Sequence, residues 1–408
     1  MANANRIQTD LETLRDMTEP CKEGTTRFSY TPAYRRAADY VISQMRAAGL
    51  EPREDAVGNI YGLRRGKNPD APKIISGSHL DTVHCSGYFD GQAGIICALE
   101  AARMLEENEI ALESDYEVVA TIMEEGARFK NLSGSKFGMG VFTEEMLDTM
   151  TDDDGITLRE AMTAYGLSGD LTDVCRKDEP VKAFLEVHME QGSRLENQGI
   201  DLGIVDTIWG CRWFHLSCKG VTAHPSTPMS ERQDTVLATA VLISRMSDLL
   251  AKEYVGRATV TVGRIKPYPD QLNAIASETQ FTMDFRSGYE SCFMELDDAL
   301  AKEIARVEEE YRVKFTHELY SYTPPTPNHP AIKEALEESV NELGFTSMHM
   351  YSGAGHDAMV YGMYWPIAML FLPSHLGLTH CKDEWCDYET VAKGADVLYE
   401  TIKKMDAR

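Results

Sequence analysis

Three short apolar segments of the sequence each end in side chains that can bind a metal ion, and this feature restricts the fold more than any other. The segments cover residues 73–77, Tyr116–Met123 and Ala183–Met189. His79 lies just beyond the first segment, Glu125 beyond the second, and His188 at the end of the third. Apolar runs of this length are typical of strands that are buried on both faces of a sheet. The sequence therefore predicts a buried sheet with polar strand ends.

Segments with helical spacing of apolar residues alternate with these strands. Residues 30–49 show this spacing, and so does the segment that contains Ile95, Leu99 and Leu105. Strands that alternate with helices predict an α/β fold with right-handed connections. Because ligands bind beyond the carboxyl ends of strands in such sheets, we expect the polar strand ends to form one site.

The pattern changes after residue 210. Predicted strands and helices then follow in the order β-α-β-β-α-β, which is typical of a ferredoxin-like domain of about a hundred residues. The Pro-rich segment 321–330 closes this region, and the earlier alternation resumes after it. A length of 408 residues also favours two domains. We therefore expect a host domain over 1–210 and 323–408, and an inserted domain over 211–322.

The composition excludes some classes of partner. A formal net charge of −25 argues against binding to nucleic acid or to an anionic membrane surface. The apolar run 366–373 is too short to cross a bilayer, and the first residues lack the apolar core of a secretory signal. Nine cysteines, an odd number, are typical of a reducing compartment. We expect a cytoplasmic protein.

The strand-end residues, together with two residues from loops, form a set that suits two divalent metal ions. The set is His79, Asp90, Glu125, His188 and His380. Asp90 would bridge two ions about 3.5–4 Å apart, and zinc, manganese, cobalt and nickel all fit such ligands. Glu124 would point away from Glu125 on an extended chain and act as general base and acid. Asp81 would orient the imidazole of His79.

Seven motifs carry a resemblance that covers residues 28–390. They are GSHLDTV–FDG, EEGARF–GS, HMEQG, AHPSTPM–R–D, NAIAS–FTMDFR, SGAGHDA and LPSHLGLTH. In this order they resemble the hydantoinase/carbamoylase family of dinuclear-metal amidohydrolases. That family includes N-carbamoyl-L-amino-acid hydrolase, β-ureidopropionase, allantoate amidohydrolase and ureidoglycolate amidohydrolase. It lies within the zinc peptidase superfamily of glutamate carboxypeptidase and aminoacylase.

The resemblance implies a zinc-peptidase-like catalytic domain with a mixed, largely parallel sheet, and an inserted lid that also forms a homodimer. It assigns His79, Asp90 and His188 to one ion, and Asp90, Glu125 and His380 to the other. His188 favours the ureido and carbamoyl branch, because the peptidase relatives usually have a carboxylate at that position.

The resemblance also implies a set of substrate-binding residues: Gln191, His224, Asn273, Arg286, Ser352, Gly353 and Gly377. His224 would stabilise the oxyanion, and Asn273 and Arg286 would hold the substrate carboxylate, for which the planar guanidinium is suited. His356 would either line the pocket or serve as a structural hydrogen-bonding residue.

The implied activity is metal-dependent hydrolysis of a linear C–N amide bond in a ureido or N-carbamoyl acid, with release of ammonia and carbon dioxide. An aminoacylase or dipeptidase of the same superfamily is the alternative, followed by a metal-free relative without activity. The sequence departs from the family pattern at residues 84–88 and in the short motif 224–229. We expect residues 84–88 to influence the choice of substrate.

Overall fold

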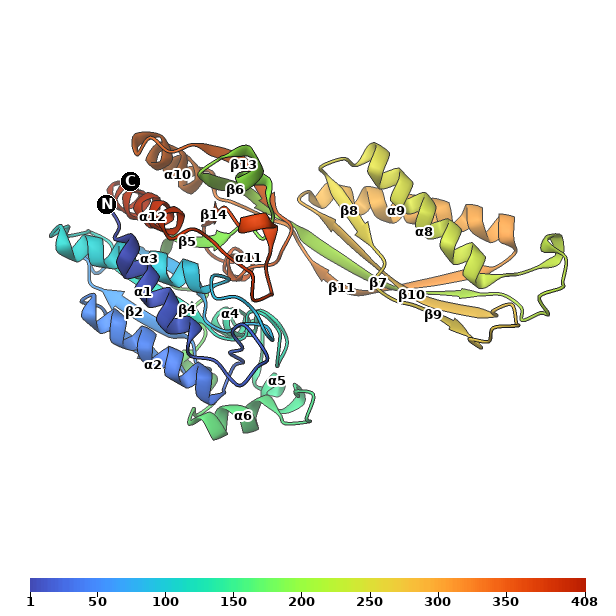
Figure 1. Cartoon of the computed structure of the whole chain (residues 1–408), viewed down its shortest axis with the longest axis horizontal. Coiled ribbons are helices and arrows are strands. Elements are labelled where there is room, and N and C mark those ends of the chain that lie inside the picture. The colour runs from blue at the N-terminus through green and yellow to red at the C-terminus, as the bar shows by residue number, and fades with distance from the viewer. The chain divides into compact units, whose positions relative to one another are not determined.

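The computed structural model describes residues Met1–Arg408 and divides them into two units (Figure 1). The first unit consists of Met1–Asp206, Pro327–Ser352 and His356–Arg408, and the second of Thr207–Thr326 with Gly353–Gly355. These limits lie four residues from the predicted boundaries at 210 and 322. The catalytic and lid roles of the two units stay predictions.

A mixed sheet of nine strands forms the centre of the first unit, and its middle strands are parallel. The strands are β1 Glu51–Glu54, β2 Ile60–Arg64, β3 Lys73–His79, β4 Tyr116–Thr121, β5 Val181–Met189, β6 Leu202–Ile208, β12 Thr326–Pro327, β13 Ser347–Ser352 and β14 Ile367–Leu372. Their order is β1-β2-β4-β3-β5-β14-β6-β12, with β13 paired to β6. The pairs β4–β3, β3–β5 and β5–β14 are parallel, so the carboxyl ends of these four strands share one edge. The predicted α/β fold with a mixed, largely parallel sheet is confirmed.

Helices flank this sheet. They are α1 Ala4–Arg15, α2 Pro32–Ala47, α3 Gln92–Glu107, α4 Ser133–Gly138, α5 Glu144–Thr149, α6 Leu158–Tyr165, α7 Arg194–Gln198, α10 Pro330–Glu342, α11 Asp357–Tyr361 and α12 Tyr388–Ala407. Helix α3 packs on β3, β4 and β5 and against α12, while α11 packs on β5 and β14 together with α4. None of the helices is both long and apolar enough to cross a bilayer.

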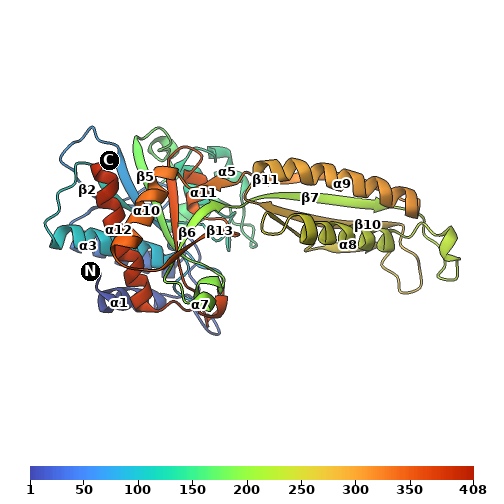
Figure 2. The same ribbon diagram turned by 90° about the horizontal axis from the view of Figure 1, so that it is seen from above.

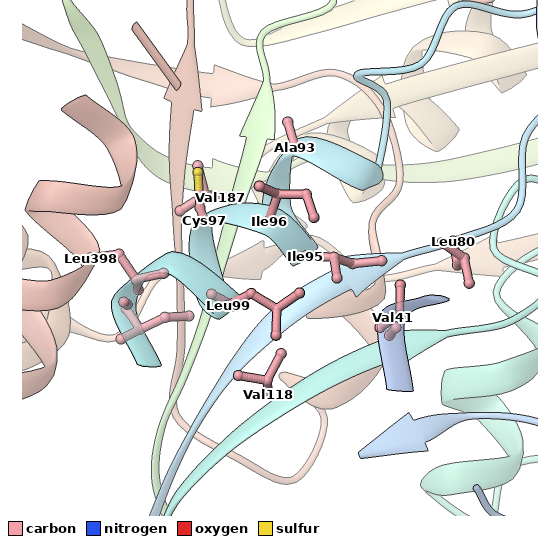
Figure 3. Close-up of a cluster of buried hydrophobic side chains, with 14 of the residues drawn as sticks. Val41, Leu80, Ala93, Ile95, Ile96, Cys97, Leu99, Val118, Val187 and Leu398 are labelled. Atoms are coloured by element: carbon pink, nitrogen blue, oxygen red, sulfur yellow. The ribbon is translucent and has the colours of Figure 1, made fainter. Parts of the chain in front are cut away.

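Helix α3 is the most buried helix at the site and fixes where the site lies. Its residues from Gln92 to Leu105 are all buried, so the helix is enclosed around its whole circumference, including the ion-paired Glu100 and Arg103. Figure 3 shows Ile95, Ile96 and Leu99 of this helix among other buried apolar side chains. A Cβ at Gly94 would lie 2.2 Å from the carbonyl oxygen of Val187, so only glycine permits this approach of helix and strand.

The second unit has its own sheet and core. Its strands are β7 Gly210–Lys219, β8 Ala258–Thr261, β9 Ile265–Tyr268, β10 Glu278–Ser287 and β11 Lys314–Thr323. They pair antiparallel in the order β11-β7-β10-β8, with β9 on β10. The helices α8 Thr235–Glu253 and α9 Glu290–Tyr311 pack on this sheet and on each other, and they run along its strands (Figure 2).

Several predicted elements differ from the observed ones. The mixed, acidic sequence of residues 141–180 predicts a solvated segment, yet these residues contain α5 and α6, whose Leu147, Leu158 and Met162 are buried. The sequence of Ala258–Ile265 predicts a single strand, but the structure has two, β8 and β9. Leu158, Ala161 and Met162 do have helical spacing, and Gly263, which interrupts the strand pattern, lies in the break between β8 and β9. Strand β4 ends at Thr121 instead of Met123, because Met123 has a left-handed backbone with φ 61°.

Candidate metal centre

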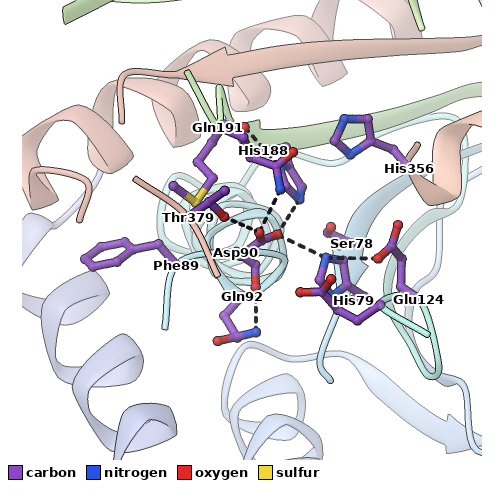
Figure 4. Close-up of polar contacts among 12 residues, drawn as sticks. Ser78, His79, Phe89, Asp90, Gln92, Glu124, His188, Gln191, His356 and Thr379 are labelled. Atoms are coloured by element: carbon purple, nitrogen blue, oxygen red, sulfur yellow. Dashed lines mark hydrogen bonds and ion pairs between the residues drawn. The ribbon is translucent and has the colours of Figure 1, made fainter. Parts of the chain in front are cut away.

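The carboxyl ends of the parallel strands bring the candidate ligands together. His79 is the last residue of β3, and His188 is the penultimate residue of β5. Glu125 follows the end of β4, and His380 lies in the loop after β14. Asp90 immediately precedes Gly91, the residue that caps the start of α3. Figure 4 shows Asp90 between His79 and His188.

The two carboxylate oxygens of Asp90 face two different groups of ligands. Oδ1 lies 3.0 Å from Nε2 of His188 and 3.4 Å from Nε2 of His79. Oδ2 lies 3.3 Å from Nε2 of His380, and the same nitrogen lies 3.3 Å from Oε2 of Glu125. The donor atoms in each group lie within 4.8 Å of one another. Asp90 therefore belongs to two groups of three ligands that share its carboxylate.

Hydrogen bonds to backbone carbonyls orient two of the imidazoles. Nδ1 of His79 lies 3.1 Å from the carbonyl oxygen of Asp81, and Nδ1 of His188 lies 2.9 Å from that of Met189. When Nδ1–H donates to these carbonyls, the Nε2 lone pair is directed at Asp90 and is free to bind a metal.

The side chain of Asp81 does not orient the imidazole of His79, as the sequence predicted, but binds backbone N–H groups. Its carboxylate lies 4.0 Å from Nδ1 of His79 and instead accepts hydrogen bonds from the backbone N–H groups of Glu124, at 3.1 Å, and Glu125, at 3.2 Å. Burial raises the pKa of this carboxyl to about 6. Asp81 thus fixes the turn that carries the two glutamates and contacts His79 only through its own backbone.

The charges around Asp90 fit divalent cations. Burial lowers the pKa of His79, but Glu124 and Asp90 outweigh that effect and raise it well above its ordinary value. Hydrogen bonds to Asp90 and Glu125 raise the pKa of His380 to about 10. The carboxylates thus favour positive charge at these nitrogens, which a metal ion would supply in place of protons, and Oε1 of Glu125 is buried without a hydrogen-bond partner. Imidazole and carboxylate donors with an orphaned buried oxygen suit zinc and similar ions.

Glu124 lies beside the first group of ligands, whereas Glu125 belongs to the second. Oε2 of Glu124 lies 3.7 Å from Nε2 of His79, and the residue is 8% exposed. The predicted extended chain is not observed here, because β4 has already ended and Met123 turns the backbone, but the two side chains still approach different histidines. Burial raises the pKa of Glu124 well above its ordinary value, and Glu125, among other acidic neighbours, adds to this effect.

Gly91 offers a direct test of how tightly His79 is packed. A Cβ at this position would lie 2.5 Å from Cε1 and Nδ1 of His79, and φ is 74°. We expect Gly91→Ala to destabilise the fold by about 1–3 kcal/mol through strain and to weaken metal binding. Gly155 is the matched control, because its φ is 78° and a Cβ there meets no atom within 4 Å. Thermal unfolding and metal content of Gly91→Ala and Gly155→Ala would separate strain from displacement of His79. Equal metal content in the two variants would contradict the prediction.

The predicted substrate residues of the first unit lie in different environments. Nε2 of Gln191 donates to Oδ2 of Asp90 at 2.8 Å, beside the candidate ligands. Ser352 and His356 are both buried, with Oγ and Nε2 2.7 Å apart. The His356 ring packs 4.5 Å from that of His188, measured between centroids, and its burial lowers its pKa well below the ordinary value. A structural role therefore suits His356. Gly377 has φ 66° in the loop before His380.

The remaining predicted residues belong to the second unit. His224 and Asn273 are exposed there, and Nδ1 of His224 lies 2.7 Å from Oγ of Ser226. Arg286 donates to Oδ2 of Asp284 at 3.0 Å and to the carbonyl oxygen of Gly353 at 2.7 Å. Part of its guanidinium is thus bonded within its own unit.

Residues 84–88 are largely structural. The backbone of Ser86 pairs with that of Thr25, and the Tyr88 hydroxyl lies 3.0 Å from that of Tyr388. Within the segment only His84 is exposed. Of these residues, only His84 therefore remains a candidate for influencing the choice of substrate.

Two residues that the sequence did not single out contact the ligands. Oγ1 of Thr379 donates to Oδ2 of Asp90 at 2.8 Å. Glu384 is buried beside it, and burial raises its pKa to about 7. The only available signal for Glu384 was an acidic residue four positions after His380, a spacing that is common on protein surfaces.

Comparison with known proteins gives a consistent result over the whole chain. The model of peptidase family M20/M25/M40 matches residues 72–404. An N-carbamoyl-L-amino-acid amidohydrolase of Paenarthrobacter aurescens is 35% identical, over 99% of this chain and 98% of that protein. An allantoate amidohydrolase of Bacillus subtilis is 32% identical, over 98% of this chain and 97% of that protein. The crystal structure of an amidase of the hydantoinase/carbamoylase family from Burkholderia multivorans has a TM-score of 0.90 at 30% identity, covering 100% of this chain and 98% of that one.

Proposed function

Since the chain belongs to peptidase family M20/M25/M40, and within it to the hydantoinase/carbamoylase branch, we propose that it hydrolyses a linear C–N amide bond in a ureido or N-carbamoyl acid. The products are an amine or amino acid, ammonia and carbon dioxide. The observation that carries this proposal is the pair of ligand groups sharing Asp90 in a chain that is similar to such amidohydrolases along its full length.

The proposed centre holds two divalent ions, zinc or else manganese, cobalt or nickel. His79, Asp90 and His188 would hold one ion, and Asp90, Glu125 and His380 the other. The shared carboxylate, and the Nε2 atoms that face its two oxygens, support this division. Divalent ions in such a centre polarise the carbonyl under attack and acidify water.

Glu124 is the proposed general base and acid. It takes the proton of the attacking water and gives it to the leaving nitrogen, a role that suits a buried carboxyl whose pKa is raised well above its ordinary value. Asp81 assists by holding the backbone of Glu124 in place. Gln191, which donates to Asp90, is placed to contact the ureido group of the substrate.

The second unit has a proposed role in substrate binding and assembly. His224, Asn273 and Arg286 bind the developing oxyanion and the substrate carboxylate, and Ser352, Gly353 and Gly377 belong to loops that contribute to the pocket. The unit acts as a lid and as the contact of a homodimer. Light scattering tests the dimer, and a substrate-bound crystal structure tests the lid. The cytoplasmic location stays a prediction.

Products distinguish this proposal from its alternative. We expect ammonia from at least one of allantoate, ureidoglycolate and the N-carbamoyl amino acids, and loss of that activity on treatment with a chelator. An aminoacylase or dipeptidase would instead cleave N-acyl amino acids or dipeptides without ammonia. Activity confined to those two classes would refute the proposal. Parallel assays with the L and D forms of each N-carbamoyl amino acid would define the stereochemistry.

A further inference from the structure

Glu384 is a buried carboxylate at the edge of the candidate centre. It lies in the loop between β14 and α12, four residues after His380, and is 1% exposed. A carboxylate that is so buried is stable only where hydrogen bonds satisfy its oxygens. The partners of Glu384 therefore show what it is built to hold.

The two oxygens of Glu384 hold two separate loops. Oε1 accepts hydrogen bonds from the backbone N–H groups of Phe89, at 2.9 Å, and Asp90, at 3.0 Å. Oε2 accepts from the backbone N–H of His380 at 3.2 Å. One side chain thus joins the loop that carries the shared ligand to the loop that carries the last ligand.

His380 needs such a contact more than the other histidines do. His79 and His188 lie at strand ends, and their rings are oriented by carbonyl groups. His380 lies in a loop, its side chain is 45% exposed, and its φ of 57° is left-handed, which is unfavourable by roughly 1–2 kcal/mol for a residue with a Cβ. The surrounding structure must hold this conformation.

A second feature indicates that the fit around Glu384 is close. A Cβ at Gly87 would lie 2.4 Å from Cβ and 2.5 Å from Oε1 of Glu384, so the chain leading to Asp90 passes directly over this carboxylate. The neighbouring Trp385 packs against Phe89, with ring centroids 5.2 Å apart.

We propose that Glu384 is a positioning residue that sets the distance between Asp90 and His380, and thereby the affinity of the second ion position. This inference rests on the proposed metal centre. Both Asp90 and His380 belong to the second group of ligands, whereas only Asp90 belongs to the first. Loss of the contact therefore weakens the second position more than the first.

The test is Glu384→Gln, measured by equilibrium dialysis of the metal-free full-length protein against Mn²⁺. The glutamine keeps the shape, but its NH₂ group meets a backbone N–H where an acceptor is needed. We expect the dissociation constant of the second position to rise about 10–100-fold, as is typical of residues that orient ligands, and that of the first to rise less. His380→Ala in both backgrounds identifies the second position.

Asp406→Asn is the matched control. Asp406 accepts hydrogen bonds from the backbone N–H groups of Glu113, at 2.9 Å, and Ser114, at 2.7 Å. These residues precede β4, at the end of the strand opposite to the candidate centre. We expect this variant to lower the melting temperature of the metal-free protein about as much as Glu384→Gln does, with wild-type Mn²⁺ binding.

Three results would overturn the inference. Glu384→Gln could bind Mn²⁺ at both positions with wild-type constants. The dissociation constants of the two positions could rise by the same factor in Glu384→Gln. Asp406→Asn could raise these constants as much as Glu384→Gln does. Either result would mean that general destabilisation weakens metal binding. Wild-type protein that binds fewer than one ion per subunit would instead refute the metal centre itself, and the inference with it.

Discussion

Replacing Asp90 with alanine is expected to remove both ions and to lower turnover by about 10⁴-fold or more. Its Oδ1 faces His79 and His188, and its Oδ2 faces His380, so no other residue can serve both groups of ligands. Polarisation by the ions is worth several kcal/mol of transition-state stabilisation, and each 1.36 kcal/mol is about tenfold in rate.

His380→Ala is the comparison for this prediction. It removes a ligand from the second group only, so we expect about one ion per subunit to remain. Metal analysis after gel filtration, together with the rate of ammonia release, provides the measurement. If Asp90→Ala retained one tightly bound ion, Asp90 would not be the shared ligand.

Replacing Glu124 with glutamine is expected to leave both ions bound and to lower turnover by about 10³-fold, which is within the range of general acid–base catalysis. The substitution keeps the size of the side chain and removes its capacity to take a proton. Glu124 lies 3.7 Å from His79 but belongs to neither group of three ligands, so metal binding does not depend on it.

Glu125→Gln separates the two neighbouring acids. It alters a ligand of the second group, so it should reduce metal content as well as turnover. Atomic absorption for both variants, with kcat measured at saturating metal, checks the prediction. A Glu124→Gln variant with near wild-type kcat would exclude Glu124 as the base. If that variant lost metal instead, the residue would be a ligand.

The strand-end rule explains why so much of the centre could be predicted. His79, His188 and Glu125 each follow an apolar run, and parallel pairing of β3, β4 and β5 brings such ends to one edge. Side-chain direction beyond a strand could not be predicted in this way. Met123 has a left-handed backbone and turns Glu124 toward the histidines. A positive φ cannot be predicted from a methionine, because this residue type rarely adopts it.

The roles of buried acids were the least predictable part of the site. Asp81 was expected to bind an imidazole, yet its carboxylate binds backbone N–H groups of the next strand's loop. Glu384 does the same for two loops that are about 290 residues apart in the sequence. Such contacts depend on how loops meet in three dimensions, which apolar periodicity does not encode.

The predicted substrate residues also differ in how far their positions could be predicted from the sequence. Gln191 follows β5 directly and contacts Asp90, so its place could be read from the strand. In residues 84–88, which depart from the family pattern, His84 is exposed and the rest of the segment contacts Thr25, Thr26 and Tyr388. Most of this segment therefore has a structural role.

The central claim is tested most directly by adding Zn²⁺ or Mn²⁺ stepwise to the metal-free protein. Ammonia release from N-carbamoyl amino acids, allantoate and ureidoglycolate is measured at each step. The account predicts that ammonia release reaches its maximum at two ions per subunit and that Asp90→Ala stays inactive throughout. Full activity without added metal, saturation at one ion per subunit or fewer, or turnover only of substrates that yield no ammonia would contradict it.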